Sequence, residues 1–134
     1  MSQGQIIILD CQGETKPAIC FNLEVGGYRM RIVRDEDEAI NLLNNTRLTN
    51  EQFSGLLVNN PYLNVDISKI VEGVHKTGID IPVIFVKDSA NLKKIVADLS
   101  LEYTMPRIYH AEPTRVVALL STLQVKARAE GNGF

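Results

Sequence analysis

The chain has 134 residues, of which 45% are hydrophobic and 22% charged, and its formal net charge is −2. This length and composition predict one globular domain with a core of its own. The weak negative charge and the lack of a basic run argue against nucleic acid as a partner. No apolar segment approaches the roughly 18 residues that cross a membrane, and no signal peptide is evident. With only two cysteines, Cys11 and Cys20, we expect reduced thiols in a cytoplasmic protein.

The first part of the chain alternates predicted strands and helices. Residues 6–9 form a continuous apolar run, which predicts a strand buried on both faces, and Asp10 follows it. A helix is expected next, with Thr15 as its N-cap and a C-cap at Gly26-Gly27. Residues 28–33 begin with polar and apolar positions in alternation, which is typical of an edge strand.

An acidic run at residues 35–38 comes before the next apolar positions. These acids fit the first turn of a helix, where the macrodipole favours negative charge, better than they fit a metal site. A polar connection at residues 44–50 then leads to a central buried strand at residues 55–58, which ends at Asn59.

The second half continues the same alternation. Asp66 is expected to cap a helix that ends with His75 near Gly78, because apolar residues recur there at helical spacing. A buried strand at residues 81–86 ends at Lys87 and is followed by a helix with an apolar face. A short strand at residues 107–110 and a last helix that begins at Thr114 complete the series. We expect a single domain at residues 1–125 and a polar tail or linker start at residues 126–134.

Five strands that alternate with five helices predict an α/β fold with a parallel sheet and helices on both faces. The flavodoxin-like three-layer sandwich, with strand order 2-1-3-4-5, places the buried runs inside the sheet and the alternating run at its edge. Ligands of such folds bind at the carboxyl ends of the strands. This arrangement predicts a crevice that contains Asp10, Asn59 and Lys87, with Glu112 just after the fifth strand.

The residues of this crevice do not form a recognisable catalytic or cofactor site. Asn59 has no titratable proton and is a poor nucleophile, and Asp10 alone would hold Mg²⁺ poorly. No glycine-rich phosphate-binding motif occurs, and His75 and His110 do not form a metal-binding pair. We therefore expect no enzyme activity, no metal and no cofactor. The alternative is a flavodoxin-like small-molecule-binding domain or enzyme that uses the crevice near Asp10 and Asn59.

Several segments resemble response-regulator receiver domains. Residues 27–43, GYRMRIVRDEDEAINLL, are similar to the family segment G-Y-x-V-x-x-A-x-[DN]-G-x-E-A-L-x-x-L. Residues 81–86 resemble the family's fourth strand, and Tyr109-x-x-Glu112-Pro113 resembles the Y-x-x-K-P that ends its fifth strand. The resemblance implies the flavodoxin-like fold and a role in two-component signalling and phosphorelay.

The same alignment changes the positions that carry phosphorylation in the family. The resemblance places the two metal-binding acids on Asp10 and Cys11, and the phosphorylated aspartate on Asn59. It places the phosphoryl-binding hydroxyl on Lys87, the lysine of the fifth strand on Glu112 and the switch aromatic on Tyr109. Aspartyl phosphorylation at Asn59 is thus chemically excluded. We expect the Lys87 ammonium either to lie near Asp10 and Asn59, in place of metal and phosphoryl charge, or to extend into solvent.

The sequence therefore predicts an atypical receiver-like signal-transduction module that acts by protein–protein contact without phosphorylation. Its partner is expected to be another protein or an effector domain of its own chain, as in the N-terminal regulatory part of a transcriptional regulator. The resemblance implies contact through the fourth-helix, fifth-strand and fifth-helix face, and a homodimer through the last helix and fifth strand is one form of it. Neither nucleic acid nor a membrane is expected as a partner of this domain.

Overall fold

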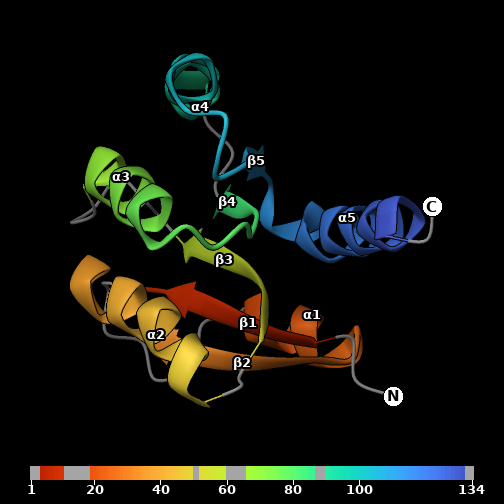
Figure 1. Ribbon diagram of the computed structural model, residues 1–134. Coiled ribbons are helices and arrows are strands. Elements are labelled where there is room, and N and C mark those ends of the chain that lie inside the picture. Colours follow the sequence, from red (N-terminus) through yellow and green to blue (C-terminus); the bar gives the residue numbers. More distant parts are fainter. Residues whose placement is uncertain (1–3, 11–18, 50–51, 60–65, 87–89, 132–134) are drawn as a thin grey trace.

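The computed structural model describes residues 4–10, 19–49, 52–59, 66–86 and 90–131, in which strands and helices alternate along the chain (Figure 1). The strands are β1 (Gly4–Leu9), β2 (Tyr28–Val33), β3 (Phe53–Asn59), β4 (Val83–Val86) and β5 (Ile108–Ala111). The helices are α1 (Ile19–Val25), α2 (Glu36–Thr49), α3 (Ile67–Thr77), α4 (Ala90–Glu102) and α5 (Val116–Gly131), and a short 3₁₀ helix (Pro113–Arg115) precedes α5.

The five strands form one parallel sheet in the order β2-β1-β3-β4-β5, which confirms the predicted topology. The continuous apolar runs lie in the interior strands β1, β3 and β4, which are covered on both faces. β2 and β5 are the edges. The alternation of β2 follows from this position, because Arg29 and Arg31 are exposed while Tyr28 and Val33 are buried.

Helices cover both faces of the sheet and form the outer layers of the predicted sandwich (Figure 1). The side chains of α2, α3 and α4 pack on one face, where Ile7 and Leu9 belong to the core. Those of α1 and α5 pack on the other face, where Ile6 and Ile8 belong to a second core. Successive residues of a strand point to opposite faces, so one apolar run supplies both cores.

The ends of α3 follow from its sequence. The carboxylate of Asp66 accepts a hydrogen bond from the backbone N–H of Lys69 at 3.1 Å, as an N-cap does. At the other end, Gly78 adopts a left-handed conformation with φ 71°, and its N–H bonds to the carbonyl of His75. Both predicted ends are therefore confirmed. The N-cap expected at Thr15 lies outside the described residues.

Two helices run further than the apolar pattern indicates. The sequence predicts a polar connection from residue 44, but α2 continues to Thr49, so that prediction is wrong for residues 44–49. Residues 44–49 are polar except for Leu48, so no apolar spacing marks this part of the chain as helical, while the Thr46 hydroxyl bonds to the carbonyl of Leu43 at 2.7 Å. α5 continues to Gly131 and so includes residues 126–131. None of the helices in the described part of the chain has the length and apolarity needed to cross a membrane.

Candidate functional site

Asp10 and Asn59 lie next to each other at the carboxyl edge of the sheet. Leu9 of β1 pairs with Val58 of β3, so the residue that follows each of them occupies the next position of the register. Alternation along the strands places both side chains on the face of Ile8 and Leu57, which belongs to α1 and α5. Asp10 is fully buried and Asn59 is partly buried. The structure therefore brings together the two residues on which the predicted crevice depends.

The backbone around Asp10 is held by the end of β2. The N–H of Asp10 donates to the carbonyl of Val33 at 3.0 Å, which extends the pairing of β1 with β2 by one residue. The carbonyl of Asp10 accepts a hydrogen bond from Nη1 of Arg34 at 3.5 Å. Arg34 thus brings its guanidinium to the backbone of Asp10 at the edge of the crevice. The sequence motif did not single out Arg34, because its position is variable in the family segment.

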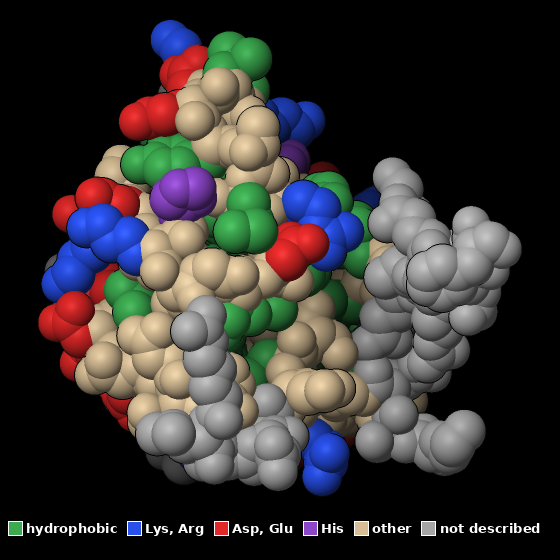
Figure 2. Space-filling view, in the orientation of Figure 1, with side chains coloured by type: hydrophobic (Ala, Val, Ile, Leu, Met, Phe, Trp, Pro, Cys, Tyr) green, Lys and Arg blue, Asp and Glu red, His purple; other side chains and the backbone are tan. Residues whose placement is uncertain are grey.

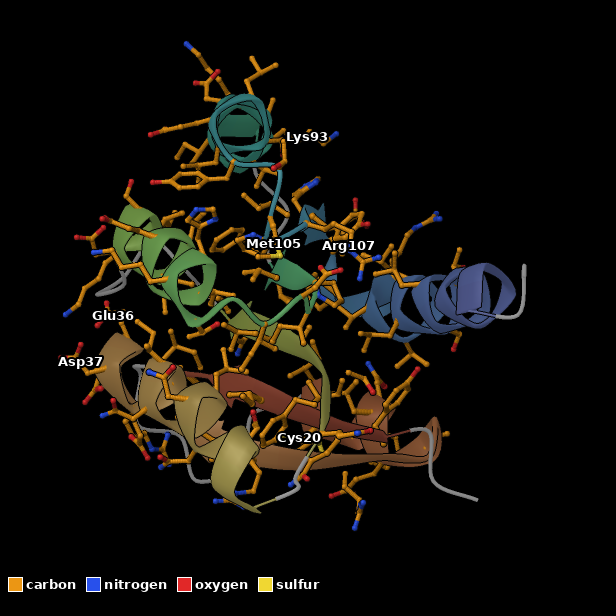
Figure 3. The ribbon with its side chains drawn as sticks, in the orientation of Figure 1. Cys20, Glu36, Asp37, Lys93, Met105 and Arg107 are labelled. Carbon is orange, nitrogen blue, oxygen red and sulfur yellow. The ribbon has the colours of Figure 1, made fainter. Side chains whose placement is uncertain are left out.

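A set of charged side chains joins the first turns of α2 and α3, next to the crevice. Oε1 of Glu36 accepts a hydrogen bond from the N–H of Asp66 at 2.9 Å. Nζ of Lys69 lies 3.2 Å from Oδ1 of Asp37, and this hydrogen-bonded pairing raises the pKa of Lys69 above its ordinary value of 10.5. Glu36 and Asp37 lie on the side of α2 that faces α3 (Figure 3), where acidic and basic groups are interspersed on the surface (Figure 2).

The acids of the first turn of α2 therefore have a structural use. Glu38 donates its N–H to Oδ1 of Asp35 at 2.8 Å, while its own carboxylate accepts the N–H of Arg34 at 3.0 Å, which forms a capping arrangement. The helix-start interpretation of residues 35–38 is confirmed, because Glu36, Asp37 and Glu38 occupy the first turn of α2. Glu36 stands where the family segment has glycine, and this departure supplies the contact to Asp66.

Glu112 and Tyr109 lie at the opposite edge strand, β5. Glu112 is exposed and precedes the 3₁₀ helix without a side-chain capping bond. It lines a groove between α4 and α5 with Lys93, His110 and Arg115. Tyr109 is partly buried and packs against the core under α5. The sequence places Glu112 just after the fifth strand, at the edge of the crevice. The structure shows in addition that Glu112 lines this groove.

Two of the predicted site positions cannot be placed. Cys11 and Lys87 lie outside the described residues. Whether the Lys87 ammonium approaches Asp10 and Asn59 therefore stays a prediction. The register does fix where β4 ends, because Asn59 pairs with Val86.

The donor set of this crevice does not fit the Mg²⁺ that the receiver family implies. Asp10 contributes one carboxylate, and its neighbour Asn59 is an amide that carries no charge. Mg²⁺ prefers an octahedral set of oxygen ligands that includes carboxylates, and the position next to Asp10 is a thiol, Cys11. Among the described residues, no three acidic, histidine or cysteine side chains gather in a way that could hold a metal ion.

No family model and no curated protein matches the sequence. Similarity to solved structures is extensive, however. The crystal structure of NtrX from Brucella abortus matches with a TM-score of 0.68 at 14% identity, over 95% of this chain and 29% of that one. The chain thus spans less than a third of the NtrX chain.

Two shorter proteins match over nearly their whole length. The receiver domain of the Francisella response regulator 1452 matches with a TM-score of 0.65 at 18% identity, over 92% of this chain and 98% of that one. A CheY-like receiver domain protein from Methanospirillum hungatei matches with a TM-score of 0.61 at 18% identity, over 99% and 100% of the two chains. At these identities the likeness concerns the fold, and it shows that the chain has the fold of response-regulator receiver domains.

Proposed function

We propose that this chain is an atypical receiver-like signal-transduction module that acts by protein–protein contact without aspartyl phosphorylation. The observation that carries the proposal is that β3 ends in an asparagine, Asn59, which lies beside the buried Asp10. This strand end is the position of the phosphorylated aspartate in the family that the sequence resembles. The receiver fold supports a signalling role, and the changed residue supports a signal that does not depend on a phosphoryl group.

The chemistry at this position supports the same proposal. Phosphorylation of a receiver forms an acyl phosphate by attack of a carboxylate, which the carboxamide of Asn59 cannot provide. The remaining carboxylate, Asp10, is fully buried, and Arg34 contacts the backbone carbonyl of the same residue. Among its described residues the site has one acid and no group of side chains that could hold a metal ion, and phosphoryl transfer relies on such an ion to neutralise the developing charge. We therefore assign no enzymatic activity to the crevice.

The proposed contact face consists of α4, β5 and α5. β5 is an edge strand with neighbours only on the β4 side, and α4 and α5 pack on opposite faces of the sheet beside it. The partner is a separate protein, a second copy of this chain, or an effector domain for which this module is the N-terminal regulatory part. The negative net charge supports a protein rather than nucleic acid, and a cytoplasmic location is part of the proposal.

Acetyl phosphate with Mg²⁺ tests the proposal through the intact mass of the protein. The wild-type chain should gain no phosphoryl group under conditions that fully modify a receiver domain with an intact aspartate, run alongside. The Asn59→Asp variant should also stay largely unmodified, because the second metal-binding acid remains Cys11. A stoichiometric, hydroxylamine-sensitive mass gain in the wild-type chain would show that another acid accepts phosphate, and the proposal would be wrong.

A further inference from the structure

A groove of about 360 Å³ lies between α4 and α5, above the end of β5. Lys93 reaches it from α4, His110 and Glu112 from the end of β5, and Arg115 from the 3₁₀ helix. In Figure 3, Lys93 leaves α4 on the side where α5 lies. Four ionisable side chains from three separate segments thus meet in one groove, which their sequence positions do not reveal.

The charge of this groove is opposite to that of the chain. Lys93 and Arg115 contribute two positive charges and Glu112 one negative charge, so the lining is net positive while the chain has a net charge of −2. Both cations are exposed, and neither forms an ion pair with any residue that the structure describes. An incoming carboxylate would therefore have two cations to pair with, and no existing pair would need to be broken.

His110 adds a polar atom that has no partner. Its Nε2 is buried and makes no hydrogen bond within the described part of the chain. This atom is covered, so His110 contributes the body of its ring to the wall of the groove, and the charged groups that an incoming carboxylate can reach are those of Lys93 and Arg115.

The groove also offers apolar contacts, and these distinguish a peptide from a free anion. Ala111, Ala118 and Leu119 line it beside the charged groups. An inorganic anion would use only the cations, whereas an acidic side chain flanked by apolar residues would use both kinds of contact.

We infer that this groove binds an acidic segment of a partner protein and seats one of its carboxylates between Lys93 and Arg115. The inference rests on the proposed function and names the chemistry of its contact face. Glu112 acts as a selectivity element, because its own charge disfavours a segment in which acids stand side by side. A single acid between apolar neighbours is the preferred sequence.

The test uses ¹⁵N-labelled full-length protein and two capped pentapeptides, Leu-Gly-Glu-Gly-Leu and the same peptide with Gln in the centre. The Glu peptide should give saturable shifts of the Ala111 and Ala118 amides, and the Gln peptide should bind about two- to fivefold more weakly, the upper part of the range for one exposed charge pair. Lys93→Gln and Arg115→Gln should each weaken the Glu peptide by a similar factor. Lys94→Gln is the matched control, since Lys94 is an exposed α4 cation outside the groove, and it should change nothing.

Equal shifts with the two peptides, shifts scattered over the surface, or an equal loss in Lys94→Gln would overturn the inference. The same would follow if phosphate ion alone saturated the groove amides as tightly as the Glu peptide, because the site would then serve a free anion. Concentration-dependent shifts of these amides without peptide would instead assign the groove to a second copy of the chain. The acetyl phosphate assay is independent of all these results, so the groove can be rejected while the proposed function stands.

Discussion

The packing of α2 against α3 depends on Gly73, and its replacement by alanine gives a sharp test of the structure. A Cβ at this position would lie 2.2 Å from Cδ1 and 2.8 Å from Cγ1 of Ile40. Both distances are shorter than real carbon contacts, and the branched Ile40 side chain has few alternative rotamers. α2 and α3 run side by side here (Figure 1), so Gly73→Ala must displace either Ile40 or one of the two helices.

Two opposing effects set the size of the change. Alanine is more favourable than glycine inside a helix by about 1 kcal/mol. Overpacking of a well-packed contact costs about 1–3 kcal/mol. With a crowding cost of about 2 kcal/mol, the variant Gly73→Ala should lose about 1 kcal/mol of unfolding free energy. For a chain of this size that corresponds to a fall of about 3 °C in Tm.

Urea unfolding of a double-mutant cycle separates the two effects. In the Ile40→Ala background the obstructing atoms are gone, so Gly73→Ala should stabilise that variant by up to about 1 kcal/mol. The sign of the Gly73→Ala effect should thus reverse, with a coupling of about 2 kcal/mol. The close contact between the helices would be refuted if Gly73→Ala stabilised the wild-type protein. It would also be refuted if Gly73→Ala destabilised the wild-type protein and the Ile40→Ala variant equally.

Two further predictions concern the charged side chains that join α2 to α3. Glu36→Ala should speed hydrogen exchange at the Asp66 amide, because it removes the acceptor of that amide. Glu36→Gln keeps an acceptor oxygen and should preserve the protection. Equal exchange rates in the two variants would count against the contact. Asp37→Asn should lower the pKa of Lys69 toward 10.5, which NMR titration of the lysine side chain measures. Because the ion pair raises the pKa of Lys69 in the folded protein, its contribution to stability is complete below pH 10.5 and is lost as the pH rises through the raised pKa. If Asp37→Asn left the pH dependence of stability unchanged, this assignment would be contradicted.

The fold could be predicted from sequence because local and global signals agree. The apolar runs that end at Asp10 and Asn59 indicate buried parallel strands, and the alternating residues 28–33 indicate an edge. The caps of α3 were also visible, since Asp66 and Gly78 have the residue types that these positions require. The end of α2 was not visible in the sequence, because residues 44–49 are polar except for Leu48 and carry no apolar pattern of a helix.

The site could be predicted only in part. The predicted topology makes the first and third strands neighbours, so the proximity of the residues that end them, Asp10 and Asn59, could be predicted. The groove was not, since Lys93, His110 and Arg115 come from three segments and no spacing in the sequence relates them. Glu36 was identified as a helix-start acid, but its bond to Asp66 depends on how α2 and α3 pack.

The most direct test of the central claim is an NMR titration with Mg²⁺ and beryllium fluoride, which mimics an aspartyl phosphate. We expect the amides of Asp10 and Asn59 to show no saturable shift, because β3 ends in asparagine rather than aspartate and the described residues around it form no fitting metal site. Saturable shifts at these amides that spread to β5 and α5 would show that the crevice still takes the phosphoryl mimic. In that case the chain would be a phosphorylation-responsive receiver, and the account given for Asn59 would be wrong.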